Sequence, residues 1–137
     1  MKIVSACLAG VKCRYDGKAN YSQHVIELIM KGEAIPVCPE QLGGLATPRP
    51  PVEQRGGRCY TDSGKDVTDA FEKGAEEAVH IAKLARCTEA ILKANSPSCG
   101  CGKVYDGNFS RTLVEGDGIF AALLKREGIL VKTEKDF

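Results

Sequence analysis

Five short runs with the character of β-strands alternate along the chain with three longer segments of helical character. The strand-like runs are 2–6, 34–37, 58–60, 90–93 and 129–132, and the helical segments are 23–31, 67–87 and 118–126. Strands that alternate with helices at this spacing form a mostly parallel sheet with right-handed crossovers. The pattern therefore predicts an α/β fold, a three-layer Rossmann-like domain whose mostly parallel sheet has about four or five strands.

Two segments between these elements differ sharply in character. Apolar residues recur at three- and four-residue spacing across 67–87, which predicts the longest helix, with one face buried against the sheet. The segment 39–57 is rich in proline and glycine and has no helical or strand period. We expect it to be a long irregular loop, of the kind that often carries part of a functional site.

The size and charge of the chain argue against a nucleic-acid-binding protein. A chain of 137 residues fits one domain and can bury a self-sufficient core. Its 19 basic and 18 acidic residues give a formal net charge of +1, so no overall field would attract a polyanion. Two small basic clusters are interpreted as solvated surface; they are Lys12, Arg14 and Lys18, and Arg49, Arg55 and Arg58.

The cysteine content needs an explanation. The apolar run of Ile3 and Val4 is too short for a signal peptide or a membrane span, so we expect a cytoplasmic protein with no membrane partner. Seven cysteines, an odd number, in a reducing compartment argue against a disulfide framework. They favour metal binding or catalysis instead.

Three of the cysteines follow predicted strands. Cys7 comes after the first strand, Cys38 after the second, and Cys99 lies in the loop after the strand at 90–93. The carboxyl ends of parallel strands share one edge of a sheet, where ligands bind in folds of this class. We therefore expect these thiols to converge within reach of a metal centre.

The remaining cysteines divide into two groups. Cys59 and Cys87 are interpreted as small buried hydrophobic residues. Cys13 and Cys101 each lie close in sequence to a proposed ligand, so each could be a fourth ligand, a redox partner or a bystander.

Several polar residues accompany the three thiols. Glu40 follows Cys38 closely and could transfer a proton at the site, or could form a surface salt bridge. Ser96 and Ser98 precede Cys99 and offer hydroxyl groups, although ordinary turn chemistry also explains them. The two histidines, His24 and His80, fall on predicted helices away from this edge and are interpreted as structural.

Motifs in register along nearly the whole chain closely resemble the thiouracil desulfidase (TudS) family, formerly a domain of unknown function. The matching segments are Cys7-Leu8-Ala9-Gly10 with Arg14-Tyr15-Asp16-Gly17, Val37-Cys38-Pro39-Glu40-Gln41-Leu42-Gly43-Gly44-Leu45 with Thr47-Pro48-Arg49-Pro50, Leu92-Lys93 with Ser96-Pro97-Ser98-Cys99-Gly100, and Tyr105-Asp106-Gly107-x-Phe109-Ser110. The resemblance implies that residues 1–137 form a single desulfidase-like domain. Cys13, Cys101 and Arg111 depart from the pattern.

The resemblance also implies a cofactor and roles for the site residues. The family holds a [4Fe–4S] cluster with three cysteines, which leaves one iron not ligated by protein; the matching ligands here are Cys7, Cys38 and Cys99. Glu40 then resembles the acid/base group and Ser96 a helper in proton transfer, with Ser98 as a weaker candidate.

The implied reaction is a non-redox desulfuration of a thiolated nucleobase, 2-thiouracil or a similar base, to the oxo base with release of sulfide. A small-molecule base or nucleoside is expected rather than tRNA, since the relatives that act on tRNA are larger and carry an additional domain. One alternative is a non-catalytic metal- or cluster-binding or redox-sensing protein, in which Cys101 closes the open iron position. A thiol redox protein using Cys7 and Cys13 is another.

Overall fold

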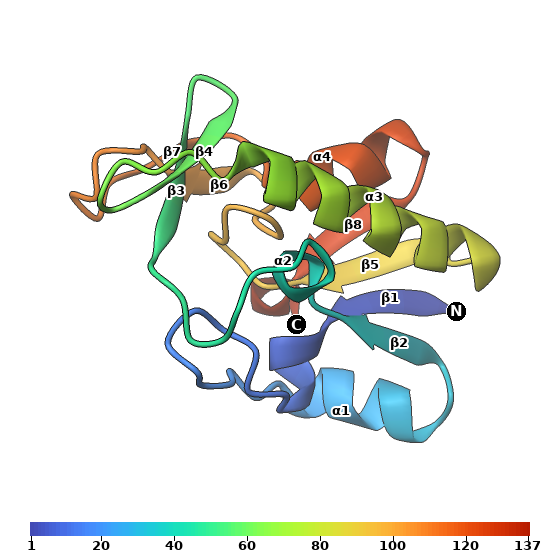
Figure 1. Ribbon diagram of the computed structural model, residues 1–137. Coiled ribbons are helices and arrows are strands. Elements are labelled where there is room, and N and C mark those ends of the chain that lie inside the picture. The colour runs from blue at the N-terminus through green and yellow to red at the C-terminus, as the bar shows by residue number, and fades with distance from the viewer.

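The centre of the molecule is a four-stranded parallel sheet. The structure is a computed structural model that describes residues 1–137, and its strands run in the order β2-β1-β5-β8 (Figure 1). These strands are β1 (Lys2–Ser5), β2 (Ala34–Val37), β5 (Glu89–Leu92) and β8 (Leu130–Thr133), and all three pairings are parallel. The α/β prediction is therefore confirmed, with four strands in the sheet.

Helices cover both faces of this sheet. Helix α1 (Gln23–Met30) lies on one face, and α3 (Thr68–Leu84) and α4 (Ile119–Arg126) lie on the other (Figure 1). Successive residues of a strand point to opposite faces. Accordingly, Ile3 belongs to the core beneath α3 and α4, whereas its neighbour Val4 packs in the core with α1. The three predicted layers are thus present.

A very short helix, α2 (Pro39–Leu42), is held against α3 by close backbone contact. A Cβ atom added to Gly74 of α3 would overlap the carbonyl oxygen of Pro39, and one added to Gly43 would overlap that of Ala70. Only glycine permits this approach. The contact fixes the start of α2, which immediately follows Cys38.

Two antiparallel hairpins lie outside the main sheet. One pairs β3 (Val52–Arg55) with β4 (Arg58–Thr61), and the other pairs β6 (Lys103–Tyr105) with β7 (Leu113–Glu115). The prediction of an irregular loop over 39–57 was therefore wrong at α2 and β3. Each of these two elements has only four residues, too few to show a period.

The hairpins form a lobe beside the carboxyl-end edge of the parallel sheet (Figure 1). The Gln54 side chain secures this lobe, because its Nε2 donates to the carbonyl oxygens of Pro97 at 2.8 Å and Asp117 at 3.0 Å.

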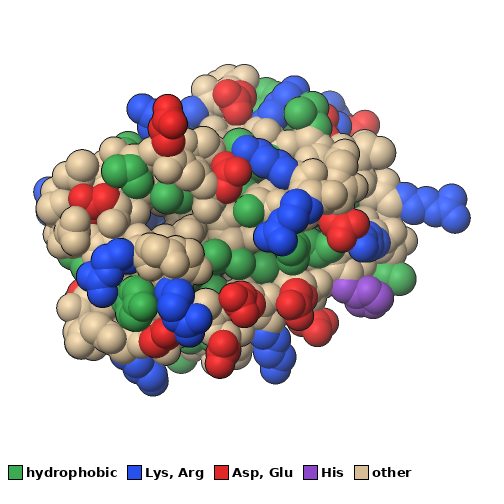
Figure 2. All heavy atoms as spheres, turned by 90° about the horizontal axis from the view of Figure 1, so that it is seen from above, with side chains coloured by type: hydrophobic (Ala, Val, Ile, Leu, Met, Phe, Trp, Pro, Cys, Tyr) green, Lys and Arg blue, Asp and Glu red, His purple; other side chains and the backbone are tan.

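Acidic and basic side chains are interspersed on the face above α3 and α4 (Figure 2). None of the helices combines the length and apolarity that crossing a bilayer requires.

Candidate functional site

A cavity of about 540 Å³ opens between the carboxyl-end edge of the sheet and the hairpin lobe. Four of the seven cysteines line it, namely Cys7, Cys13, Cys38 and Cys99. The structure thus brings together the three cysteines that the strand positions selected and adds Cys13 to them. A cavity of this volume is typical of sites for small molecules.

Each of the three predicted cysteines is placed by the segment that follows its strand. Cys7 lies in a single 3₁₀ turn, Ala6–Ala9, directly after β1, and its carbonyl accepts from the N–H of Asn20 at 2.9 Å. Cys38 is the residue that caps α2, with Pro39 at the first helical position. The N–H of Cys99 donates to Ser96 Oγ at 3.1 Å, which orders the loop after β5.

Cys13 ties its own loop to Cys38. The Cys38 thiol donates to the carbonyl oxygen of Cys13 at 3.8 Å, and the Cys13 side chain is almost fully buried. A hydrogen bond with Cys38 lowers the pKa of Cys13, but a hydrogen bond with Cys7 and burial raise it, to about 11 overall. The interaction with the Cys13 side chain and burial also raise the pKa of Cys38. Burial raises the pKa of Cys99 to about 12.

The thiols of this cavity are ligands of the kind that iron–sulfur clusters use. No three histidine, cysteine, aspartate or glutamate side chains meet in the arrangement that one metal ion requires. In a tetranuclear cluster each thiolate binds a separate iron, so the ligands surround a space instead of meeting at a point. Cys7, Cys38 and Cys99 all line one cavity. Because metal binding requires thiolates, a metal centre held by Cys38 and Cys99 would have to displace protons from both thiols.

Glu40 lies in the same cavity with both carboxylate oxygens engaged. Its Oε1 accepts from Arg49 Nε at 3.0 Å, and its Oε2 accepts from Ser98 Oγ at 2.8 Å. The side chains of Arg49 and Glu40 are only 6% and 13% exposed. The salt bridge considered from the sequence therefore exists, but it is buried rather than on the surface.

The two serines before Cys99 continue this hydrogen-bonded chain. Ser96 Oγ accepts from the N–H groups of Ser98 and Cys99 at 3.2 and 3.1 Å, and lies 3.0 Å from Ser98 Oγ. Since the Ser98 hydroxyl donates to Glu40, it is the Ser96 hydroxyl that donates to Ser98. The donors therefore run from Ser96 through Ser98 to Glu40.

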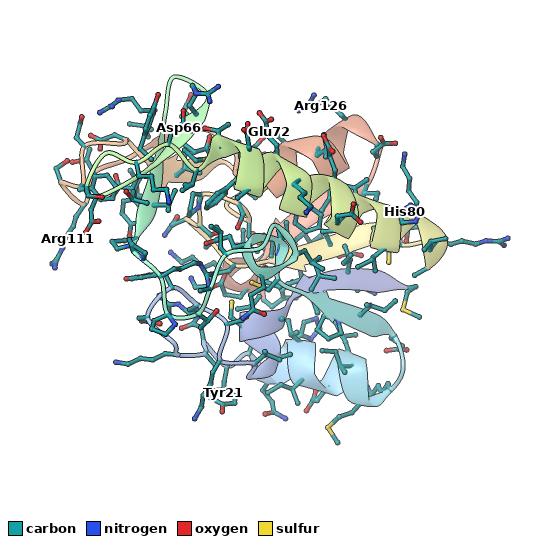
Figure 3. All side chains as sticks on the ribbon, viewed as in Figure 1. Tyr21, Asp66, Glu72, His80, Arg111 and Arg126 are labelled. Carbon is teal, nitrogen blue, oxygen red and sulfur yellow. The ribbon has the colours of Figure 1, made fainter.

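The remaining cysteines and both histidines lie outside the cavity. Cys101 packs at the edge of the core, where its thiol donates to the carbonyl of Val131 at 3.7 Å, so it does not reach the other thiols. Cys59 and Cys87 are buried, as predicted. The two histidines are likewise remote: His24 stacks on Phe137, and His80 lies toward the end of α3 distant from the hairpin lobe (Figure 3).

Two arginines that the sequence placed on solvated surface, Arg14 and Arg49, line the cavity instead. The interpretation as solvated surface suits Arg58, which is 52% exposed, but is wrong for Arg49. A signal was available, because Arg49 lies between prolines in the loop that follows Cys38 and Glu40. Arg111, which departs from the family pattern, also lines the cavity and projects from the hairpin lobe (Figure 3).

Comparison with known proteins supplies the family. The family model for 2-thiouracil desulfurase matches residues 3–136, almost the entire chain that forms this cavity. The chain belongs to the 2-thiouracil desulfurase family. The resemblance stated from the motifs is thereby confirmed.

Two relatives show how closely this 2-thiouracil desulfurase family member follows known proteins. The uncharacterized protein YbbK of Bacillus subtilis (strain 168) is 41% identical over 146 residues, which cover 99% of this chain and 97% of that protein. The solved structure of a [4Fe–4S]-dependent thiouracil desulfidase, TudS, is 44% identical, with a TM-score of 0.94. That match covers 98% of this chain and 91% of the other.

Proposed function

We propose that this chain converts a thiolated nucleobase such as 2-thiouracil to the oxo base and releases sulfide. The observation that carries the proposal is the convergence of Cys7, Cys38 and Cys99, from three separate loops, on one cavity. Family membership and the similarity to the [4Fe–4S]-dependent TudS support it. Residues 1–137 are proposed to act as a single desulfidase-like domain.

In this proposal Cys7, Cys38 and Cys99 hold a [4Fe–4S] cluster. When bound, a cluster with one iron not ligated by protein supplies a Lewis acid that attracts the soft sulfur of the substrate and makes the adjacent carbon more electrophilic. The balance is thiocarbonyl plus water to carbonyl plus hydrogen sulfide, with no net transfer of electrons. The cavity of about 540 Å³ has room for a free base or nucleoside.

Glu40 is proposed to take the proton from the attacking water. It lies in the cavity with the thiols, and its carboxylate is an acceptor held by two donors. Ser96 is proposed to help return protons to the departing sulfur. The Ser96 hydroxyl reaches Glu40 through the Ser98 hydroxyl. Ser98 is therefore proposed as the link between Ser96 and Glu40 in this series of hydrogen bonds.

The test is anaerobic turnover by the reconstituted protein in ¹⁸O-labelled water. We expect one sulfide for each oxo base formed, with the label in the base. Glu40→Gln keeps the size of the side chain and should retain iron while losing about 10²-fold or more in kcat. Sulfide without labelled base, or full activity of Glu40→Gln, would contradict the proposal.

Cys13 favours a second candidate, a non-catalytic cluster-binding or redox-sensing protein. Its side chain is buried beside the cavity and interacts with both Cys7 and Cys38, so it could complete a four-thiolate site. Replacement of Cys13 by serine separates the two candidates. The desulfidase keeps its iron and turnover in this variant, whereas a four-thiolate site loses iron.

A further inference from the structure

Arg49 makes four hydrogen bonds from an almost fully buried position. Its Nε donates to Glu40 Oε1 at 3.0 Å, and its Nη2 donates to the carbonyl oxygen of Cys13 at 2.9 Å. Its Nη1 donates to Ala46 O at 3.2 Å and Thr47 Oγ1 at 2.9 Å. All three guanidinium nitrogens are therefore committed, and the side chain is 6% exposed.

This arrangement determines where the Glu40 carboxylate points. Glu40 stands in a helix of only four residues, α2, whose length provides little restraint on a side chain. Its other oxygen is held by Ser98, from the loop of Cys99. Arg49 thus completes a two-sided clamp, and its bond to Cys13 keeps the Glu40 loop beside the thiols.

We propose that Arg49 is a positioning residue for the reaction: it orients Glu40 for proton transfer at the cavity and acts through Glu40 alone. The inference rests on the proposed function. Lysine cannot substitute, because a single ammonium does not reproduce the planar fork that reaches acceptors in several directions.

The surface offers a matched comparison. Arg58 also pairs with a carboxylate, that of Asp66, at 2.8 Å, but these side chains are 52% and 39% exposed and lie outside the cavity. Exposed pairs of this kind contribute little. Arg58→Met therefore controls for the loss of an arginine–carboxylate pair in general.

The experiment is a double-mutant cycle on anaerobically reconstituted protein. Arg49→Met should lower kcat by at least about 10-fold while KM stays within about twofold, because proton transfer is affected and substrate binding is not. The variant with both Arg49→Met and Glu40→Gln should be no slower than Glu40→Gln alone. Arg58→Met should match the wild type.

Several outcomes would overturn the inference. A wild-type kcat in Arg49→Met protein that holds its full iron content would overturn it. A double variant whose fold-loss in kcat equals the product of the two single fold-losses would also overturn it. If Arg49→Met does not fold, Arg49→Lys takes its place with the same expectations. A wild type that desulfurates no thiolated base would instead refute the proposed function.

If the wild type desulfurates no thiolated base, the positioning role of Arg49 can still be tested by crystallography. Crystal structures of the cluster-free wild type and Arg49→Met should show Glu40 bonded to Ser98 in the first and displaced from it in the second. An unmoved Glu40 would overturn the positioning role whatever the protein catalyses.

Discussion

Replacement of Gly74 by alanine tests the contact that places Cys38 and Glu40. In an unconstrained helix this change stabilises by about 1 kcal/mol, since alanine has the higher helical propensity. Here the new Cβ would overlap the carbonyl oxygen of Pro39, so the backbones of α2 and α3 must separate. Overpacking of this kind costs about 1–3 kcal/mol, and a rigid backbone atom gives way less easily than a side chain.

The two effects oppose each other, and the overlap should dominate. We expect Gly74→Ala to lower the free energy of unfolding by up to about 2 kcal/mol. Urea unfolding of the reduced, cluster-free protein measures this, with the m-value as a check that both proteins unfold in the same way. Iron uptake should fall as well, because α2 starts directly after Cys38.

The sign of the change makes the test decisive. Lys73→Ala, at the exposed position next to Gly74, serves as the control and should change stability by no more than about 0.5 kcal/mol. An increase in stability of about 1 kcal/mol in Gly74→Ala would refute the close contact of the two helices.

Four further substitutions probe the site and its frame. Cys101→Ser should keep full iron content and turnover, whereas Cys99→Ser should lose iron, as iron analysis after anaerobic reconstitution will show. Hydrogen bonds from the hydroxyl and N–H of Thr68 and from the Arg58 guanidinium lower the pKa of Asp66 to about 2. The stability that these bonds contribute is present above pH ~4 and is lost as the pH falls toward ~2. Asp66→Asn should remove this pH dependence of thermal unfolding. Gln54→Ala removes donors to two carbonyls and should destabilise by about 1–3 kcal/mol in urea unfolding.

The parallel sheet could be predicted because its determinants are local. Each main strand is a short apolar run, and each is separated from the next by a segment that includes a helix or helical turn. That alternation predicts a parallel sheet. Because the carboxyl ends of parallel strands share one edge, Cys7, Cys38 and Cys99 are expected at the same edge. The structure places all three at one cavity, and their role as cluster ligands stays a prediction.

The clamp on Glu40 could not be predicted in the same way. Ser98 reaches the Glu40 carboxylate from 58 residues away, and Arg49, which lies nine residues from Glu40, also bonds to a carbonyl 36 residues away. Such contacts depend on how loops meet in space and leave no spacing in the sequence. The hairpin of β3 and β4 is an intermediate case, because Gly56 and Gly57 at its turn, with φ of 60° and 77°, are a recognisable signal for a tight hairpin.

An iron-edge anomalous diffraction map of crystals grown anaerobically from reconstituted protein tests the central claim most directly. The account predicts a cluster of about four irons in the cavity, bound by the sulfur atoms of Cys7, Cys38 and Cys99, with one iron free of any protein thiolate. A fourth thiolate from Cys13 on that iron, or iron bound elsewhere on the chain, would contradict it.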